Sequence, residues 1–187
     1  MRMVLVVVTS MLVATVAVAQ QQGAVQNKKQ TPQAAPFHLV VNTPKNAPDF
    51  ALRDSQGKLI RLSDYKGKVV LVDFWATWCG GCKEEIPWYI DFEKKYGKKG
   101  FLAIGIAEDR GFDVVRPFMA EHKMNYPVAI DNMSLLAKYG DNGAMPATYL
   151  VAPDGRIVDY TVGIVNRAEF ERKIQAMLGR QDGEKAD

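Results

Sequence analysis

The stretch FWATWCGGCKEEIP, from Phe74 to Pro87, contains both cysteines of the 187-residue chain, Cys79 and Cys82. It overlaps VVLVDFW (Val69–Trp75), a nearly continuous apolar run of the kind that forms a central strand covered on both faces. From Cys79 to Tyr96 the apolar residues recur with helical spacing. The cysteines therefore lie where a buried strand gives way to a helix. They can be a metal pair, a structural disulfide or a redox pair.

Two of these three interpretations fit the chain poorly. A disulfide across two intervening residues closes a very small loop, which removes little entropy from the unfolded chain. A zinc site needs about four ligands, whereas the chain adds only His38 and His122, both far from the pair in sequence. A lone CxxC pair at a strand-to-helix junction favours redox chemistry.

The position of each cysteine suggests its role in such a pair. Cys79 begins the helix, where free N–H groups and the positive end of the helix dipole stabilise a thiolate. Trp78 precedes it at an exposed strand end, so Cys79 is the expected nucleophile. Cys82 is three positions further on and faces the same side of the helix, so it is the expected resolving thiol.

The rest of the chain alternates between strand and helix patterns, which predicts an α/β fold with a central mixed sheet flanked by helices. Pro87 is expected to kink the helix that starts at Cys79, and Ser134 is expected to cap a later short helix. The predicted elements are a hairpin of Ala51–Asp54 and Leu59–Leu62, a strand at Phe101–Ala107, a helix at Val114–His122, a strand at Tyr126–Asp131, a helix at Ser134–Tyr139, a hairpin of Thr148–Val151 and Ile157–Val162, and a helix at Ala168–Leu178.

The N-terminal segment has a different character. Residues 1–19 combine Arg2 with an apolar run ending in Ala17-Val18-Ala19, which is typical of a cleaved secretory signal peptide. An uncleaved membrane anchor is the alternative, although the run is short for a span of roughly 20 residues. Residues 20–42 are predicted to be a flexible tether with a short strand at Phe37–Asn42, residues 43–179 the folded domain, and residues 180–187 a disordered tail.

Composition and charge limit the possible partners. The chain is 48% hydrophobic and 24% charged, with a formal net charge of +3, which is ordinary for a soluble α/β protein. No block of Lys and Arg stands out, so a nucleic-acid partner is not implied. Export predicts an extracytoplasmic location, the periplasm, where a disulfide can persist. Contact with a membrane is expected only if the N-terminal segment is retained.

The residues around the pair resemble the active-site segment of thioredoxin-fold proteins. The matching positions are Asp73-Phe74-Trp75-Ala76, Trp78-Cys79-x-x-Cys82-Lys83 and Pro87. The remainder is similar to the exported TlpA/ResA-like branch, a set of extracytoplasmic thiol–disulfide oxidoreductases. The similarity includes the upstream hairpin APDFALRDSQGKLIRLSDYKGK, the 67 positions from Cys79 to Pro146, and MPATYLVAPDGRIV. It spans roughly Asn46 to Leu178.

This resemblance implies a thioredoxin-like fold with an N-terminal hairpin and an inserted strand–helix unit. It implies a cis bond at Met145-Pro146, beside the disulfide, where the substrate backbone is held. It also implies that Asp73 is a buried acid that exchanges a proton with Cys82 through water, with a raised pKa. Glu108 falls where the branch often places an acid near the pair, although a solvated strand-end charge explains it equally well. The residues expected to contact a client are Trp78, Gly80, Gly81, Met145 and Pro146.

No diffusible cofactor and no metal are expected, since the electrons reside in the cysteines. The implied partners are protein thiol and disulfide clients and an upstream membrane electron donor. The clients stay open: cytochrome maturation proteins, sporulation or envelope proteins, and general disulfide repair all fit.

One departure from the family pattern is the pair Gly80-Gly81, because the family usually has proline before the second cysteine. Two glycines loosen the first helical turn, which leaves the direction of action, reducing or oxidising, open. Two other functions are also retained. One is a thiol peroxidase, although Thr77 lies two residues before Cys79 and peroxiredoxins place a threonine three residues before theirs. The other is a copper- or metal-binding module using CxxC and histidine.

Overall fold

The computed structural model describes residues 45–141 and 143–184. The predicted signal segment 1–19, the tether and the strand Phe37–Asn42 lie outside the described residues, as do 185–187 at the end of the predicted tail. The chain separates into two units, Met1–Gln33 and Ala34–Asp187, and all described residues belong to the second. None of the helices in this described part combines the length and apolar character needed to cross a membrane.

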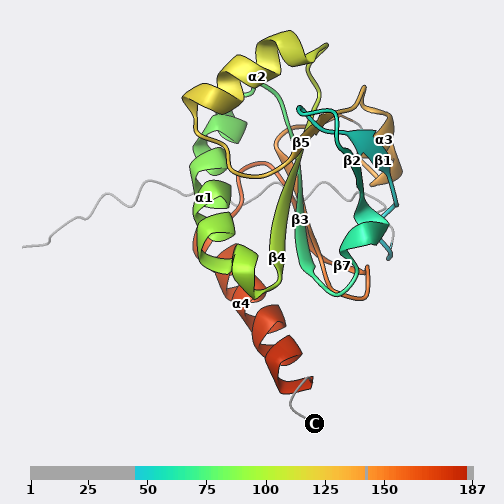
Figure 1. The fold of residues 1–187 in the computed structure, drawn as a ribbon, viewed down its shortest axis with the longest axis vertical. Coiled ribbons are helices and arrows are strands. Elements are labelled where there is room, and N and C mark those ends of the chain that lie inside the picture. The colour runs from blue at the N-terminus through green and yellow to red at the C-terminus, as the bar shows by residue number, and fades with distance from the viewer. Residues whose placement is uncertain (1–44, 142, 185–187) are drawn as a thin grey trace, which may run out of the picture. The chain divides into compact units, whose positions relative to one another are not determined.

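A mixed five-stranded sheet, ordered β5-β4-β3-β6-β7, forms the centre of the fold (Figure 1). β3 (Val69–Trp75) pairs in parallel with β4 and antiparallel with β6, and all seven of its residues are buried. This confirms the predicted central strand. The other strands of this sheet are β4 (Phe101–Ala107), β5 (Val128–Ile130), β6 (Ala147–Val151) and β7 (Ile157–Val162).

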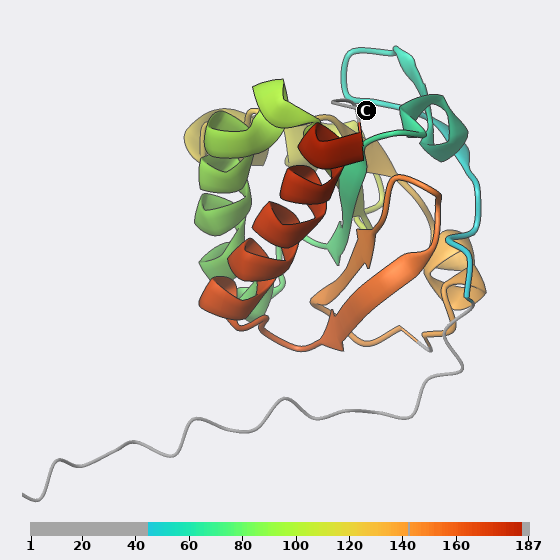
Figure 2. The same ribbon diagram turned by 90° about the horizontal axis from the view of Figure 1, so that it is seen from below.

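Helices cover both faces of the sheet. α1 (Gly80–Tyr96) and α4 (Arg167–Glu184) lie side by side over one face (Figure 2), where the Lys95 ammonium on α1 lies 3.1 Å from the Glu171 carboxylate on α4. α2 (Phe112–Glu121) packs into the same apolar cluster as α1. α3 (Ser134–Lys138) covers the other face with the N-terminal hairpin. That hairpin consists of β1 (Ala51–Arg53) and β2 (Leu59–Arg61), and two 3-10 turns complete the fold, η1 (Leu62–Tyr65) and η2 (Gly97–Lys99).

β3 divides the core into two clusters because successive strand residues point to opposite faces. Leu71 and Trp75 point toward α1 and join the first cluster, which we call the α1 face. Val72 and Phe74 point the other way and join the second, the hairpin face. Asp73 alternates with these residues and so lies on the α1 face.

Three elements differ from their predicted ends by two residues or more. α2 begins at Phe112, before the predicted Val114, and the extended Gly111 is its N-cap residue. β5 is shorter than predicted, since Pro127 has no N–H for the ladder. α4 continues to Glu184, beyond the predicted end at Leu178. Gly179 and Gly183 weaken a helical pattern in sequence, but they do not end this helix.

The prediction that Ser134 caps α3 is wrong. Met133, with a positive φ of 67°, occupies the N-cap, and Ser134 is the first residue of the helix. Asp131 satisfies the exposed helix end instead: its Oδ2 accepts a hydrogen bond from the Leu135 N–H at 2.6 Å, and its Oδ1 accepts one from the Ser134 hydroxyl at 3.0 Å. The Asp131 carboxylate, three residues before Ser134, therefore takes the capping role that was predicted for the Ser134 hydroxyl.

Candidate active site

Cys79 and Cys82 are joined by a disulfide at the N-terminus of α1, with their Cα atoms 5.3 Å apart. Cys79 is the N-cap residue, and its sulfur accepts a hydrogen bond from the Cys82 N–H at 3.2 Å. This places the Cys79 sulfur against the free N–H groups of the helix end, where a thiolate is stabilised once the bond is reduced. Cys79 is 7% exposed and Cys82 only 1%, so a client reaches Cys79 first.

The turn between β3 and α1 is fixed from the neighbouring strand. The Asp109 carboxylate, just after β4, accepts hydrogen bonds from the Thr77 N–H at 2.9 Å and from the Thr77 hydroxyl at 2.7 Å. The Cys79 N–H donates to the Ala76 carbonyl at 3.1 Å. These bonds hold the sulfur of Cys79 at the carboxyl end of the central strand.

Pro146 lies directly against the first turn of α1, and the Met145–Pro146 bond is cis, as the resemblance implies. A Cβ added to Gly81 would lie 3.2 Å from Pro146 Cδ and 3.2 Å from Ile164 Cγ1. The same addition to Gly80 would meet nothing within 4 Å. Gly81 is therefore suited to a close approach between the disulfide turn and the proline loop, a reason separate from the loosening predicted from sequence.

An apolar rim surrounds the disulfide. Trp78 is 66% exposed and Ile164 is 42% exposed, while Met145 is half-buried. Trp75, by contrast, is fully buried, as expected for a core residue. Ile164 was not predicted as a site residue, because nothing in its local sequence marks the loop after β7 as a neighbour of the cysteines. Large exposed apolar side chains gathered around a reactive group are typical of a surface that binds another chain.

Asp73 is buried on the α1 face of β3 and is 1% exposed. Its register partners are Gly105 on β4 and Thr148 on β6. Neither carboxylate oxygen meets hydrogen-bond geometry with a partner in the described part of the chain. Burial raises the pKa of Asp73 well above 3.8, and the neighbouring Glu85 carboxylate raises it further, while the Thr148 hydroxyl counteracts part of the shift.

Glu85 is a second buried carboxyl group, and it was not predicted from the sequence as a site residue. It is one helical turn after Cys82 and has no exposed surface. Its Oε1 accepts a hydrogen bond from the Val165 N–H at 2.6 Å. The pKa of Glu85 is raised to about 7, mainly because the group is buried. Hydrogen bonding to the Val165 N–H and to Tyr89 lowers the pKa and offsets part of this rise. The signal was available, because Glu85 falls on the same helix stripe as the inward residues Cys82 and Tyr89.

Glu108 lies at the end of β4, where its N–H donates to the Trp75 carbonyl at 2.9 Å. Its Oε2 accepts a hydrogen bond from the Met133 N–H at 2.6 Å. No hydrogen bond joins it to either cysteine within the described residues. Burial raises its pKa to about 7, helped by the charges of Asp131 and Asp109.

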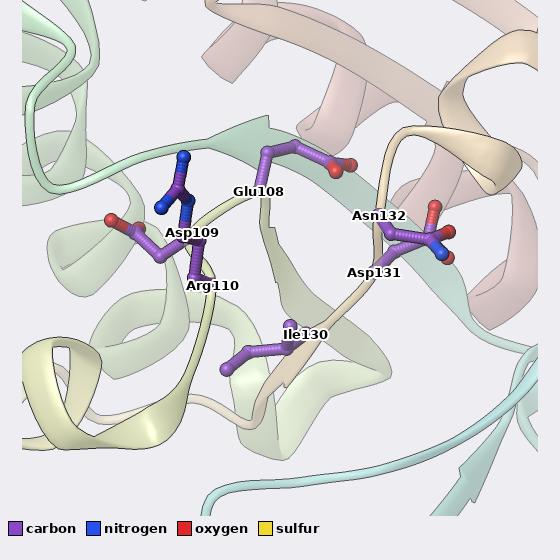
Figure 3. A pocket seen from close by; sticks show the side chains of 6 residues that line it. All are labelled: Glu108, Asp109, Arg110, Ile130, Asp131 and Asn132. Atoms are coloured by element: carbon purple, nitrogen blue, oxygen red, sulfur yellow. The ribbon is translucent and has the colours of Figure 1, made fainter.

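Glu108 also lines a hollow of about 530 Å³ at the carboxyl ends of β4 and β5 (Figure 3). Asp109, Arg110, Ile130, Asp131 and Asn132 complete its lining. Glu108 thus faces this hollow and the start of α3, and its role in the sulfur chemistry stays a prediction.

The histidines do not form a site with the cysteines in the described part of the chain. The His122 ring stacks on Phe118, with ring centroids 3.9 Å apart, and its Nδ1 lies 3.1 Å from the Phe118 carbonyl oxygen. His38 lies outside the described residues. Within residues 45–141 and 143–184, no group of three or more His, Cys, Asp or Glu side chains is arranged to hold a metal ion.

Comparisons with known proteins agree with this geometry. A sequence profile described as the AhpC/TSA family matches residues 43–160. Thiol-disulfide oxidoreductase ResA of Bacillus anthracis is 35% identical over 128 residues, which cover 68% of this chain and 73% of the relative. The ResA protein of Bacillus subtilis (strain 168) is 33% identical over 123 residues, which cover 66% of this chain and 69% of the relative.

Solved structures give the same picture. A crystal structure of a thiol:disulfide interchange protein of the thioredoxin family from Chlorobium tepidum TLS superposes with a TM-score of 0.65 and 29% identity, covering 72% of this chain and 97% of that one. A solution structure of a thiol:disulfide interchange protein from Bacteroides sp. gives a TM-score of 0.64 and 29% identity, covering 73% and 93%. The predicted thioredoxin-like fold and the ResA-like resemblance are therefore confirmed.

Proposed function

The chain belongs to the AhpC/TSA family of thioredoxin-like proteins, and we propose that it is an exported thiol–disulfide oxidoreductase acting on protein clients. The observation that carries this proposal is the Cys79–Cys82 disulfide at the helix N-terminus. The turn between the cysteines packs closely on the Pro146 loop, and the exposed apolar side chains of Trp78 and Ile164 lie beside it. One sulfur is reachable, its partner is buried, and an apolar surface beside them accommodates a polypeptide.

In the reducing direction the reaction proceeds in two exchanges. The Cys79 thiolate attacks one sulfur of a client disulfide, forming a mixed disulfide and releasing the other client sulfur as a thiolate. Cys82 then loses its proton and attacks the Cys79 sulfur. This forms the Cys79–Cys82 bond and releases the second client thiolate. Two electrons pass from the pair to the client, and each client thiolate takes up a proton according to its own pKa.

Asp73 and Glu85 are the groups we assign to the proton of Cys82. Both carboxyl groups are buried behind the pair, and burial raises the pKa of each. A carboxyl group with a raised pKa accepts a proton near neutral pH far better than an ordinary one. Asp73 therefore acts as the general base when Cys82 attacks and as the acid in the reverse exchange. Glu108, whose carboxylate accepts a hydrogen bond from the Met133 N–H, adds a negative charge at the edge of the site when it is ionised.

Export, the electron source and the client class extend this proposal. The apolar segment ending at Ala17-Val18-Ala19 supports an extracytoplasmic, periplasmic protein, with retention as an anchor as the alternative. A protein that repeatedly reduces clients needs its own disulfide reduced again, and a membrane protein passing electrons outward supplies that need. Cytochrome maturation proteins, other envelope proteins and damaged disulfides are the candidate clients.

A thiol peroxidase is the competing enzyme reading, and Thr77 argues against it. Its hydroxyl donates to Asp109 at 2.7 Å and is thereby held by that carboxylate. Peroxide consumption by the reduced protein, followed with and without a regenerating thiol, separates the two activities. Copper titration of the reduced protein, alone and as His38→Ala and His122→Ala, addresses the metal-module reading.

The decisive experiment traps clients in cells with the full-length Cys82→Ala variant. Without its resolving thiol, Cys79 is expected to hold clients as mixed disulfides that a reductant releases. The Cys79→Ala variant is the matched control and should hold none. Equal capture by both variants, or no capture by Cys82→Ala, would contradict the proposal.

A further inference from the structure

Five buried polar atoms on the α1 face have no hydrogen-bond partner among the described residues. They are both carboxylate oxygens of Asp73, Nε1 of Trp75, Oε2 of Glu85 and the hydroxyl of Tyr126. Their side chains are at most 4% exposed. Buried polar groups in folded proteins are almost always paired with protein or with an ordered water, so a group of five in one region calls for a common explanation.

Gly105 brings two of these groups next to the Asp73 position. It is the register partner of Asp73 on β4 and has no side chain to fill the space above it. A Cβ added there would lie 2.8 Å from Trp75 Nε1 and 3.4 Å from a ring carbon of Tyr126. The indole N–H of Trp75 and the ring of Tyr126 therefore both lie over Gly105, together with a methyl group of Val128 that is 3.2 Å from the same point, next to the position of Asp73 in the sheet.

Glu85 is connected to the same region through Tyr89, which lies one helical turn after it on α1. The Tyr89 hydroxyl is 2.9 Å from the Thr148 hydroxyl, and Thr148 is the register partner of Asp73 on β6. The charge of Glu85 raises the pKa of Asp73. The charges of Asp73 and Glu85 both add to the burial that raises the pKa of Tyr126 well above 10, which keeps its hydroxyl protonated at neutral pH. The four side chains thus come from β3, α1 and the segment before β5, and they face one another across the α1 face.

The hydrogen-bonding capacities of the four side chains are complementary. Trp75 and Tyr126 offer one donor each, and the two carboxyl groups offer acceptors. A water molecule both accepts and donates two hydrogen bonds, and buried waters usually make about three. We propose that Trp75, Tyr126, Asp73 and Glu85 bind one buried water molecule, which accepts hydrogen bonds from Trp75 and Tyr126 and donates hydrogen bonds to the two carboxyl groups.

This water links Asp73 to Glu85, and it makes Tyr126 a positioning residue for proton transfer. That second role rests on the proposed function. Other polar groups near the carboxyl pair are Tyr89 on α1, Thr148 on β6 and the buried Cys82, while the exposed Glu84 acts on Glu85 only through its charge. Neither carboxyl has an ion-pair partner among the described residues. Without a nearby cation, hydrogen bonds from the water become a main stabiliser of the ionised form.

A tyrosine on the opposite face provides a matched control. Tyr149 is also fully buried, and its hydroxyl also lacks a hydrogen-bond partner in the described part. It belongs to the hairpin-face cluster, away from the carboxyl pair. Tyr126→Phe and Tyr149→Phe each remove one buried hydroxyl oxygen, but only the first removes a donor to the proposed water.

The first test detects the water directly in the intact protein. A high-resolution crystal structure, or an NMR cross-peak between the Trp75 indole N–H and a long-lived water, should show the water in the wild type and in Tyr149→Phe. Its occupancy should fall in Tyr126→Phe. A dry site in the wild type would overturn the proposal. This readout needs no activity, so it stands even if the protein fails to reduce disulfides.

The second test measures the pH dependence of insulin reduction. Losing the Tyr126 donor disfavours the ionised carboxyl pair, so its pKa rises and the rising limb of the pH–rate profile moves to higher pH. The expected shift is about 0.5 to 1 pH unit, the equivalent of one net hydrogen bond. An unshifted profile in Tyr126→Phe, or the same shift in Tyr149→Phe, would overturn the positioning role. Complete inactivity of the wild type would instead contradict the proposed function.

Discussion

The two faces of β3 have opposite characters, although their side chains alternate along a single strand. On the α1 face, Asp73 is buried without a hydrogen-bond partner in the described part, next to a second buried carboxyl, Glu85. On the hairpin face, Phe74 makes edge-to-face contacts with Tyr139 and Tyr149, with ring centroids 5.2 and 5.8 Å apart. The comparison shows how one strand can separate reactive from stabilising residues, because neighbouring positions point to different cores.

Each face affects stability in its own way. The aromatic cluster on the hairpin face stabilises the fold by burying large apolar rings in favourable geometry. The carboxyl groups on the α1 face oppose folding when ionised, because burying a negative charge without a nearby positive charge is unfavourable. Proteins that retain such groups commonly use them at functional sites. Substitutions on the two faces should therefore separate stability from activity.

The largest effect is expected from Phe74→Ala on the hairpin face. Removing a fully buried ring leaves a cavity and should lower the free energy of unfolding by about 3–5 kcal/mol. Urea denaturation measures this loss, and disulfide reduction per folded molecule should stay near the wild-type rate. A large fall in that rate at unchanged stability would break the distinction between the faces.

The next effect comes from Asp73→Asn, which should change stability and activity in opposite directions. The pKa of Asp73 is raised in the folded state, so its favourable contribution is complete below its ordinary value of 3.8 and is lost as pH rises through the folded pKa. The variant should therefore match the wild type near pH 4 and exceed it by about 1–3 kcal/mol at alkaline pH. Urea denaturation at several pH values checks this.

The same variant should slow disulfide reduction at neutral pH by about 10²-fold or more, since it lacks the proton acceptor for Cys82. An unaltered pH–rate profile would refute the proton role. A variant no more stable than the wild type at any pH would show that the buried carboxyl is satisfied.

A smaller effect separates the two glycines between the cysteines. Gly81→Ala pushes a methyl group against Pro146 and Ile164 and should destabilise the disulfide turn by about 1–3 kcal/mol, toward the lower end if Ile164 moves aside. Gly80→Ala meets open space and should be neutral or slightly stabilising. Thermal unfolding and insulin reduction of both variants test this, and identical behaviour would mean that the close approach to Pro146 has no energetic role.

The smallest change in stability is expected for Trp78→Ala at the apolar rim. Trp78 is 66% exposed, so its loss should alter the free energy of unfolding by no more than about 0.5 kcal/mol. Binding of a protein client should weaken instead, seen as a raised KM for a protein disulfide with little change for a small one such as oxidised glutathione. Equal effects on both substrates would argue that Trp78 acts on the sulfurs and not on the client.

Sequence patterns predicted most of this fold because its central elements have strong periodicity. The apolar run of β3, the helical spacing after Cys79 and the turn-rich hairpins are local signals, and their strands and helices agree with the structure to within a few residues. The cis bond before Pro146 came only from the resemblance, since few X–Pro bonds are cis and no local feature selects them.

The site was harder to predict, because its parts meet only in three dimensions. Glu85 was hidden among the charges of α1, although its helix stripe could have revealed it. Tyr126 and Ile164 come from loops whose place beside the site depends on how the sheet closes. The cap of α3 was assigned to Ser134 from its residue type, whereas the Asp131 carboxylate accepts the hydrogen bond from the Leu135 N–H at the start of this helix.

The acidity of Cys79 in the reduced protein is the central requirement of the proposed chemistry. Titration of the reduced full-length protein, followed by thiolate absorbance in the ultraviolet with Cys82→Ala to isolate the signal, measures it directly. We expect Cys79 to ionise clearly below about 8.5, the ordinary value for a free cysteine, because its sulfur lies at the α1 N-terminus. Ionisation at the ordinary value, together with no reduction of insulin, would contradict the account.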